Sequence, residues 1–191
     1  LCDIHVFDCT GDWPVPDNLK SRVTLHKKCV ATKSDGGLFV TWAELVKLAG
    51  GGTESKPIAH VKMDIEGFEW GVMAQVLDQT KDPANEPFLP LQISMEVHLL
   101  TESKYEHLPA PFVAEGSASM RVPGKCHVYK LFRRLNALGK YQMIDRHDNP
   151  YCPHCSEVLL VRGSSVSEPG QVVVRLTLLS KNAHSVQTCV L

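Results

Sequence analysis

The chain lacks an excess of charge of either sign and lacks any long apolar run. Its 191 residues include 20 lysines and arginines against 21 aspartates and glutamates, which leaves a formal charge of -1. This balance gives no overall attraction to nucleic acid or to an anionic membrane. Because of this charge balance, no nucleic-acid partner is expected. No apolar stretch is long enough to cross a bilayer, so no membrane-spanning helix is expected either.

The chain also lacks a regular cysteine framework. It has seven cysteines, an odd number, and their spacing is irregular except for Cys152 and Cys155. At this length the pattern does not indicate a secreted disulfide scaffold, and it favours a reducing compartment, with the cytoplasm as the default. Residue 1 is Leu, and no signal peptide can be recognised, although a missing N-terminus would hide one.

The chain is organised around one stretch, KMDIEGFEW at residues 62–70. The residues before it are mostly apolar, as in a strand inside a parallel sheet. Gly67 permits a sharp turn, and apolar residues then recur at helical spacing from Phe68 onward. The pattern therefore predicts a buried strand, a tight acidic turn and the start of a helix.

Three carboxylates, those of Asp64, Glu66 and Glu69, lie in or beside this turn. In open α/β sheets, ligands bind at the carboxyl ends of the strands. Burial of carboxylates there is unfavourable unless they are used or paired, so Asp64 and Glu66 are candidate functional residues. Glu69 is interpreted as a charge at a helix start, where the helix dipole favours it.

Strands and helices alternate through the middle of the chain. The predicted elements include a helix with a capping box, a strand, an amphipathic helix and two closing strands, at residues 41–49, 91–98, 128–138, 141–146 and 156–162. This order predicts a mostly parallel α/β sheet with an antiparallel edge hairpin. Residues 1–163 are expected to form one domain, followed by a linker and a strand-like tail at 164–191.

The octapeptide at residues 62–69 resembles the Lys-x-Asp-x-Glu-Gly-x-Glu signature of FkbM-type and related S-adenosylmethionine-dependent methyltransferases. Three other stretches match in order and spacing: Val6-Phe7-Asp8, residues 92–98, and Asn149 followed by Cys155-Ser156-Glu157. The resemblance covers roughly residues 1–163. It implies a Rossmann-like class I methyltransferase sheet, S-adenosylmethionine as cofactor, and O-methyl transfer to a hydroxyl of a small molecule or sugar.

The resemblance also implies roles for individual residues. Asp8 would accept hydrogen bonds from the cofactor ribose, with Asp64 at the next strand end also near the cofactor. Asp64 and Glu66 would shape the methyl-transfer site, and His98 is a candidate base. His147 is a second plausible base on the same rim.

One departure from the family concerns the first strand and its glycine-rich loop, which in the family precede the strand ending at Asp8. Neither is found here, and the glycines at 50–52 follow a helix and lack the spacing of a phosphate loop. The chain therefore resembles an N-terminally truncated methyltransferase domain. We expect weak cofactor binding and strands left unpaired beside the missing one.

Other interpretations of the same residues stay open. The domain could be a non-catalytic binding or scaffold module of the same fold. A metal site is a less favoured alternative, with nitrogen and oxygen ligands from residues Asp64, Glu66, Glu96, His98, His147 and Asn149. Cys152 and Cys155 could form a redox pair, or a zinc site with His147 or His154, but buried, inert thiols are the favoured interpretation.

Overall fold

The structure is a computed structural model that describes residues 2–65, 67–79, 87–98, 125–152, 155–163 and 174–178. Glu66, one of the two candidate carboxylates of the turn, lies outside the described residues, as do His154 and most of the segment 164–191. The strands are β1 (Asp3–Phe7), β2 (Val23–His26), β3 (Cys29–Val30), β4 (Phe39–Val40), β5 (Ile58–Met63), β6 (Gln92–His98), β7 (Tyr141–Asp148), β8 (Cys155–Arg162) and β9 (Val174–Leu178). The helices are the short 3-10 helix η1 (Asp17–Leu19), α1 (Trp42–Leu48), α2 (Glu69–Gln79) and α4 (Lys125–Gly139).

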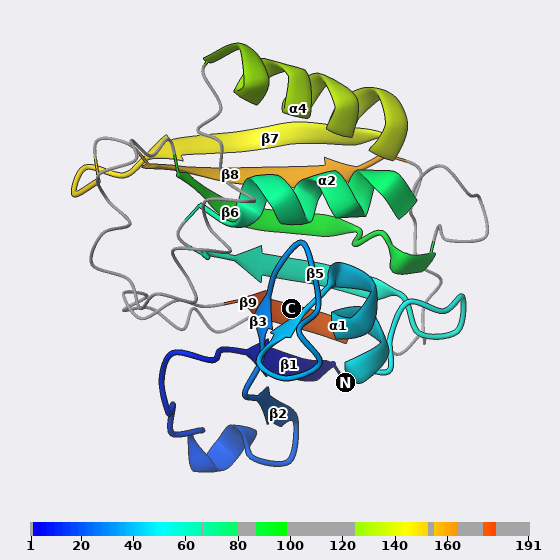
Figure 1. Cartoon of the computed structure of the whole chain (residues 1–191), viewed down its shortest axis with the longest axis vertical. Helices are drawn as coiled ribbons and strands as arrows, with labels where there is room; N and C mark the ends of the chain where they lie inside the picture. Colours follow the sequence, from blue (N-terminus) through cyan, green and yellow to red (C-terminus); the bar gives the residue numbers. More distant parts are fainter. Residues whose placement is uncertain are drawn as a thin grey trace.

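A seven-stranded sheet runs through the molecule in the order β2-β1-β9-β5-β6-β8-β7 (Figure 1). Neighbouring strands are parallel from β2 to β6. Strand β8 is antiparallel to both of its neighbours, β6 and β7. The strands β3 and β4 form a separate parallel pair. The main sheet is therefore mixed, with both kinds of ladder in one layer.

The prediction of a Rossmann-like class I methyltransferase sheet, mostly parallel and without its first strand, is wrong. The sheet is mixed, and the place expected to be empty beside β1 is filled by β9 from the segment 164–191. A strand at this place pairs the backbone groups of β1 and β5 that would otherwise lack partners. The apolar pattern at residues 172–179 identifies a strand but does not say which strands it will join.

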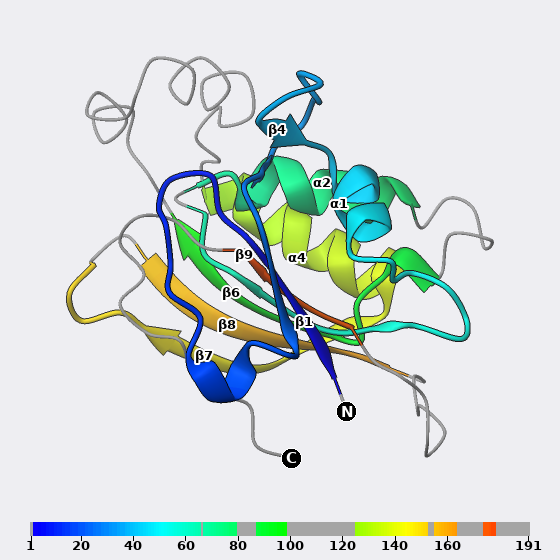
Figure 2. The ribbon, with the colours of Figure 1, turned by 90° about the horizontal axis from the view of Figure 1, so that it is seen from below.

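The described α-helices α1, α2 and α4 lie on the same face of the sheet (Figure 2). Their buried side chains share one core with the inward-facing residues of the central strands, among them Val61 and Met63 of β5 and Ile93 and Met95 of β6. Burial of each such side chain contributes roughly 1.5–3 kcal/mol, so this layer supplies much of the stability. Within the described part of the chain, no helix is long and apolar enough to cross a membrane.

Helix α1 begins as its capping box predicts. The Thr41 hydroxyl accepts a hydrogen bond from the Glu44 N–H, and the Glu44 carboxylate accepts one from the Thr41 N–H at 2.8 Å. The next residue, Trp42, is fully buried and its N–H donates to Gln75 of α2 at 2.9 Å. Satisfying these N–H groups holds α1 against α2, so the cap also fixes a tertiary contact.

Candidate functional site

Buried polar side chains follow three of the parallel strands at the edge where those strands end. Asp8 follows β1, Asp64 follows β5, and Glu96 and His98 belong to the end of β6. All four are buried, between 4% and 9% exposed. Because β9 lies between β1 and β5, Asp8 stands two strands away from Asp64, whereas β5 and β6 are direct neighbours.

The turn after β5 has the conformation that its glycine permits. Gly67 has a φ of 100°, in the region that residues with a side chain rarely adopt. The Phe68 N–H donates to the carbonyl of Ile65 at 3.2 Å, and α2 starts at Glu69. The Glu69 side chain folds back over the turn, where Oε1 accepts from the Ile65 N–H at 2.9 Å. This contact directs the Glu69 carboxylate toward the end of β6.

His98 lies at the centre of a buried cluster with three carboxylates, those of Asp64, Glu69 and Glu96. Its Nδ1 is 3.0 Å from Glu69 Oε1. Its Nε2 faces Glu96 Oε2 at 3.7 Å and Asp64 Oδ1 at 4.0 Å. The His98 carbonyl also accepts from the Trp70 indole at 2.9 Å, so the residue is fixed through its backbone and its ring. We call these four residues the His98 cluster.

The His98 cluster is an unusual concentration of negative charge inside a fold. Three carboxylates share one imidazole, and isolated carboxylates are strongly disfavoured in buried places. Lys62 on β5 forms its ion pair with Glu157 on β8 at 2.7 Å. Buried ionisable groups of this kind concentrate at functional sites, so the cluster is the best candidate site in the described chain.

Asn149 extends the cluster from the loop between β7 and β8. Its side-chain amide donates to Glu96 Oε1 at 2.8 Å, and its own Oδ1 accepts from the Tyr151 N–H at 2.9 Å. One oxygen of Glu96 is thus held by Asn149 while the other faces His98. His147, the second base suggested by the sequence, lies exposed on β7 and does not join the cluster.

Asp8 is not part of the His98 cluster and forms hydrogen bonds with residues close to it in the sequence. Its Oδ1 accepts from the Thr10 N–H at 2.6 Å and from the Thr10 hydroxyl at 2.7 Å, and its Oδ2 accepts from the Trp13 indole. This is the geometry of an aspartate that stabilises a turn. The structure therefore brings Asp64 and His98 together but places Asp8 in a separate arrangement.

Two residues, Glu69 in the His98 cluster and Cys155 beside it, were given no functional role in the favoured interpretation of the sequence. Glu69 was interpreted as a helix-start charge, yet it is 1% exposed and contacts His98. Cys155 was interpreted as an inert thiol, yet it is paired directly opposite His98 in the β6–β8 ladder. The sequence contains a signal that Glu69 belongs to the site, because it lies only three residues after Glu66. Cys155 could not be assigned to the site from the sequence, because its position opposite His98 depends on the register of β6 and β8.

The interpretation of Cys152 and Cys155 as buried, inert thiols is wrong, and the structure also contains a second disulfide that the sequence did not indicate. Cys9 is bonded to Cys29, and Cys152 to Cys155, each with Cα atoms 5.2 Å apart. The first pair joins the end of β1 to β3, which the irregular spacing could not reveal. Cys2 is a free cysteine.

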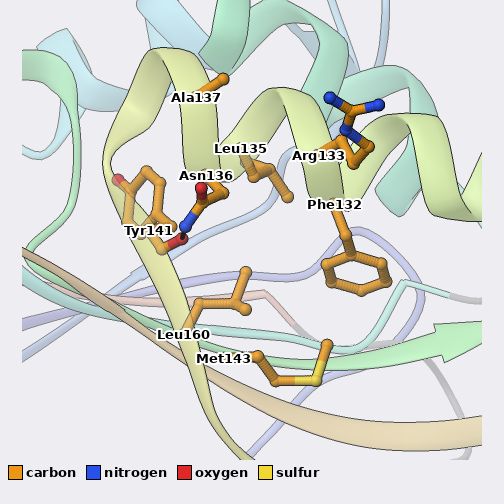
Figure 3. Close-up of a pocket in the computed structure, with 8 residues that line it drawn as sticks. All are labelled: Phe132, Arg133, Leu135, Asn136, Ala137, Tyr141, Met143 and Leu160. Atoms are coloured by element: carbon orange, nitrogen blue, oxygen red, sulfur yellow. Dashed lines mark hydrogen bonds between the residues drawn. The ribbon is translucent and has the colours of Figure 1, made fainter.

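A hollow of about 370 Å³ lies away from the His98 cluster, between α4 and the start of β7 (Figure 3). It is lined mainly by apolar side chains, including Phe132, Leu135 and Leu160. The Asn136 amide donates to the Tyr141 carbonyl at 3.0 Å along its wall. Because it offers few converging polar groups, this hollow is a weaker candidate site than the cluster.

Comparison of the chain with models of protein families, with curated proteins and with solved structures gave no match.

Proposed function

We propose that this chain is a methyltransferase domain that transfers a methyl group from S-adenosylmethionine to a hydroxyl of a small molecule or sugar. The observation that carries the proposal is the His98 cluster, which lies at the turn formed by the methyltransferase-like octapeptide at 62–69. That turn supplies Asp64 and Glu69, and the neighbouring strand supplies His98. An oriented imidazole beside a carboxylate is what activation of a hydroxyl acceptor requires.

The described residues fit the cofactor in part. Asp8 is a buried carboxylate at a strand end, as a ribose diol requires, and three of its roughly four acceptor sites are used by Thr10 and Trp13. A ribose would therefore replace part of that local bonding. For the methionine end, the described residues after β1 and β5 contain single glycines and no glycine-rich turn. We therefore assign no residue to binding of the methionine end of the cofactor.

The residues of the cluster would act on the acceptor. When bound, S-adenosylmethionine supplies an electrophilic methyl group, and the protein has to hold and deprotonate the attacking hydroxyl. His98 Nε2 would take the hydroxyl proton, while Glu69 at Nδ1 holds the ring and stabilises the imidazolium. Asp64 would accept a hydrogen bond from the acceptor and hold it in line, a positioning effect.

Methyl-transfer and binding assays test the proposal on the full chain. Isothermal titration with S-adenosylmethionine measures binding, and radiolabelled methyl transfer to a panel of hydroxyl acceptors measures turnover. We expect His98→Gln to lower turnover by about 10²- to 10⁴-fold with cofactor affinity unchanged, because only proton transfer is removed. His147→Gln, which alters an exposed histidine, is the matched control and should retain activity.

A non-catalytic binding module is the second candidate function. The observation that favours it is the local bonding of Asp8 together with the single glycines after β1 and β5. In that case neither S-adenosylmethionine nor its demethylated product would bind at millimolar concentration. That result would refute methyl transfer for this chain and favour the binding module, whereas methyl transfer to any acceptor would refute the binding module.

A further inference from the structure

We propose that Glu96, His98 and Cys155 form a binding site for a divalent transition metal of the zinc type, which the Cys152–Cys155 disulfide closes and thiol reduction opens. One potential ligand atom from each of the three residues lies within 4.8 Å of the other two, and all three residues are buried. Imidazole nitrogen, carboxylate oxygen and thiolate sulfur are the ligands that Zn²⁺ takes in proteins. The three together leave a coordination position open.

The strand register brings these donors together. In the antiparallel β6–β8 ladder, His98 is directly opposite Cys155, and Glu96 lies two residues before His98 on the same face. Glu157, opposite Glu96, is engaged by Lys62 instead. The site is thus built on two paired strands rather than on loops, which favours a fixed geometry.

Two outer contacts orient the proposed ligands. Glu69 Oε1 lies 3.0 Å from His98 Nδ1, which directs Nε2 toward Glu96. The Asn149 amide fixes one oxygen of Glu96 and leaves the other facing His98. A carboxylate on the far nitrogen of a histidine is the usual arrangement behind a metal-binding imidazole.

The charge balance of the site also favours a cation. Asp64, Glu69 and Glu96 are all buried, and within the described residues Glu69 Oε2 is a buried oxygen without a hydrogen-bond partner. Even a protonated His98 would balance only one of the three carboxylates. A divalent ion between Glu96 and His98 would supply two positive charges at the centre of the cluster.

The disulfide determines whether the third ligand is available. In the present structure the Cys155 sulfur is bonded to Cys152, so it cannot act as a thiolate ligand. A dithiol reductant would convert the disulfide to two thiols, supplying two electrons and two protons while becoming a disulfide itself. On metal binding the Cys155 thiol releases its proton and its sulfur forms the bond to the metal.

The metal site stands independently of the proposed methyl transfer. A metal bound at His98 Nε2 would prevent that nitrogen from accepting a proton, so reduction in the presence of metal would inhibit methyl transfer. The metal content can be measured without any methyl acceptor. Failure of the metal site and failure of the proposed activity are therefore distinguishable.

Titration of the full chain with Zn²⁺, and with Co²⁺ as a spectroscopic probe, tests the site. Protein reduced with a phosphine and freed of reductant should bind one ion, and Co²⁺ should give a thiolate charge-transfer band. The oxidised protein should bind the metal at least about tenfold more weakly and show no such band, because Cys155 is bonded to Cys152 and cannot coordinate the metal. Equal affinity with and without the disulfide would show that Cys155 is not a ligand.

Three variants make the test specific, with circular dichroism used to confirm that each is folded. Cys152→Ser cannot form the disulfide but keeps Cys155, so it should bind metal without reductant while the Cys9–Cys29 bond stays intact. Cys155→Ser should lose the charge-transfer band in every condition. Glu96→Gln keeps both cysteines and should weaken binding about tenfold or more after reduction. A folded Cys152→Ser variant that binds no metal would overturn the proposal.

Discussion

His98 and Glu69 are 29 residues apart in the sequence, yet Nδ1 of His98 lies 3.0 Å from Oε1 of Glu69 in the interior of the protein. One residue ends β6 and the other begins α2, so their contact joins the strand edge to the helix above it. The same Glu69 oxygen accepts from the Ile65 N–H, which ties the turn after β5 into the contact. This carboxylate therefore organises the site and also contributes to the fold.

Glu69→Ala is expected to lower the free energy of unfolding by about 1–3 kcal/mol. The substitution leaves the Ile65 N–H and the His98 ring without their acceptor in a buried place. Urea unfolding followed by circular dichroism measures the loss. Glu54→Ala removes an exposed carboxylate and should change stability by less than about 0.5 kcal/mol. Equal effects of the two variants would contradict the structural role of Glu69.

Asp8→Ala is expected to destabilise the protein by about 1–2 kcal/mol and to alter the fluorescence of Trp13. The substitution removes the acceptor for the Thr10 N–H and for the Trp13 indole. Asp12→Ala is the matched control, because Asp12 is exposed and forms an ion pair of little energetic value with the exposed Lys27. If Asp8→Ala were as stable as Asp12→Ala, the turn would not depend on the Asp8 carboxylate.

Replacement of both Cys9 and Cys29 by serine is expected to destabilise the protein by about 3 kcal/mol. The disulfide closes a loop with a sequence separation of 20 residues, and loss of such a link frees the unfolded chain. Thermal and urea unfolding of the oxidised proteins measure the difference. Cys2→Ser removes a cysteine that is free in the described part of the chain and should leave the midpoint nearly unchanged. A double variant as stable as the parent protein would show that the Cys9–Cys29 link contributes little.

Mild acidification should lower the stability of the protein because of two neighbouring histidines, His5 on β1 and His26 on β2. Burial lowers the pKa of both His5 and His26; the charge of His26 and that of Lys56 lower the pKa of His5 further, against a smaller opposing effect of Asp3. The rings stack, with Nδ1 of His5 3.0 Å from Nε2 of His26.

The sign of this effect follows from the lowered pKa values. Above about pH 6.5, the pKa of a histidine in the unfolded chain, both histidines are neutral in the folded and the unfolded protein, and their contribution to stability is fully present. As the pH falls below that value, the unfolded chain binds protons first and the contribution is lost. Replacement of His26 by Gln should therefore reduce the loss of stability between about pH 7 and pH 5, measured by urea unfolding. Identical pH dependence in variant and parent would exclude the pair as its source.

The sequence by itself determined the local elements of this protein. Thr41 and Glu44 specify a helix start through bonds between residues three apart, and Gly67 specifies a turn that few other residues permit. These features depend on neighbouring residues only, so they can be recognised in the chain. Asp64 and His98 were identified in the same way, because each follows or ends a recognisable apolar strand.

The tertiary structure decided everything that depends on which strands become neighbours. It placed β9 between β1 and β5, bonded Cys9 to Cys29, and set Cys155 opposite His98. An apolar pattern records that a strand will be buried and constrains its register once its neighbour is known, but it does not say which strands far along the chain become neighbours. The site at His98 is built from such distant pairings, so its residues are visible in the sequence while its composition is fixed only by the fold.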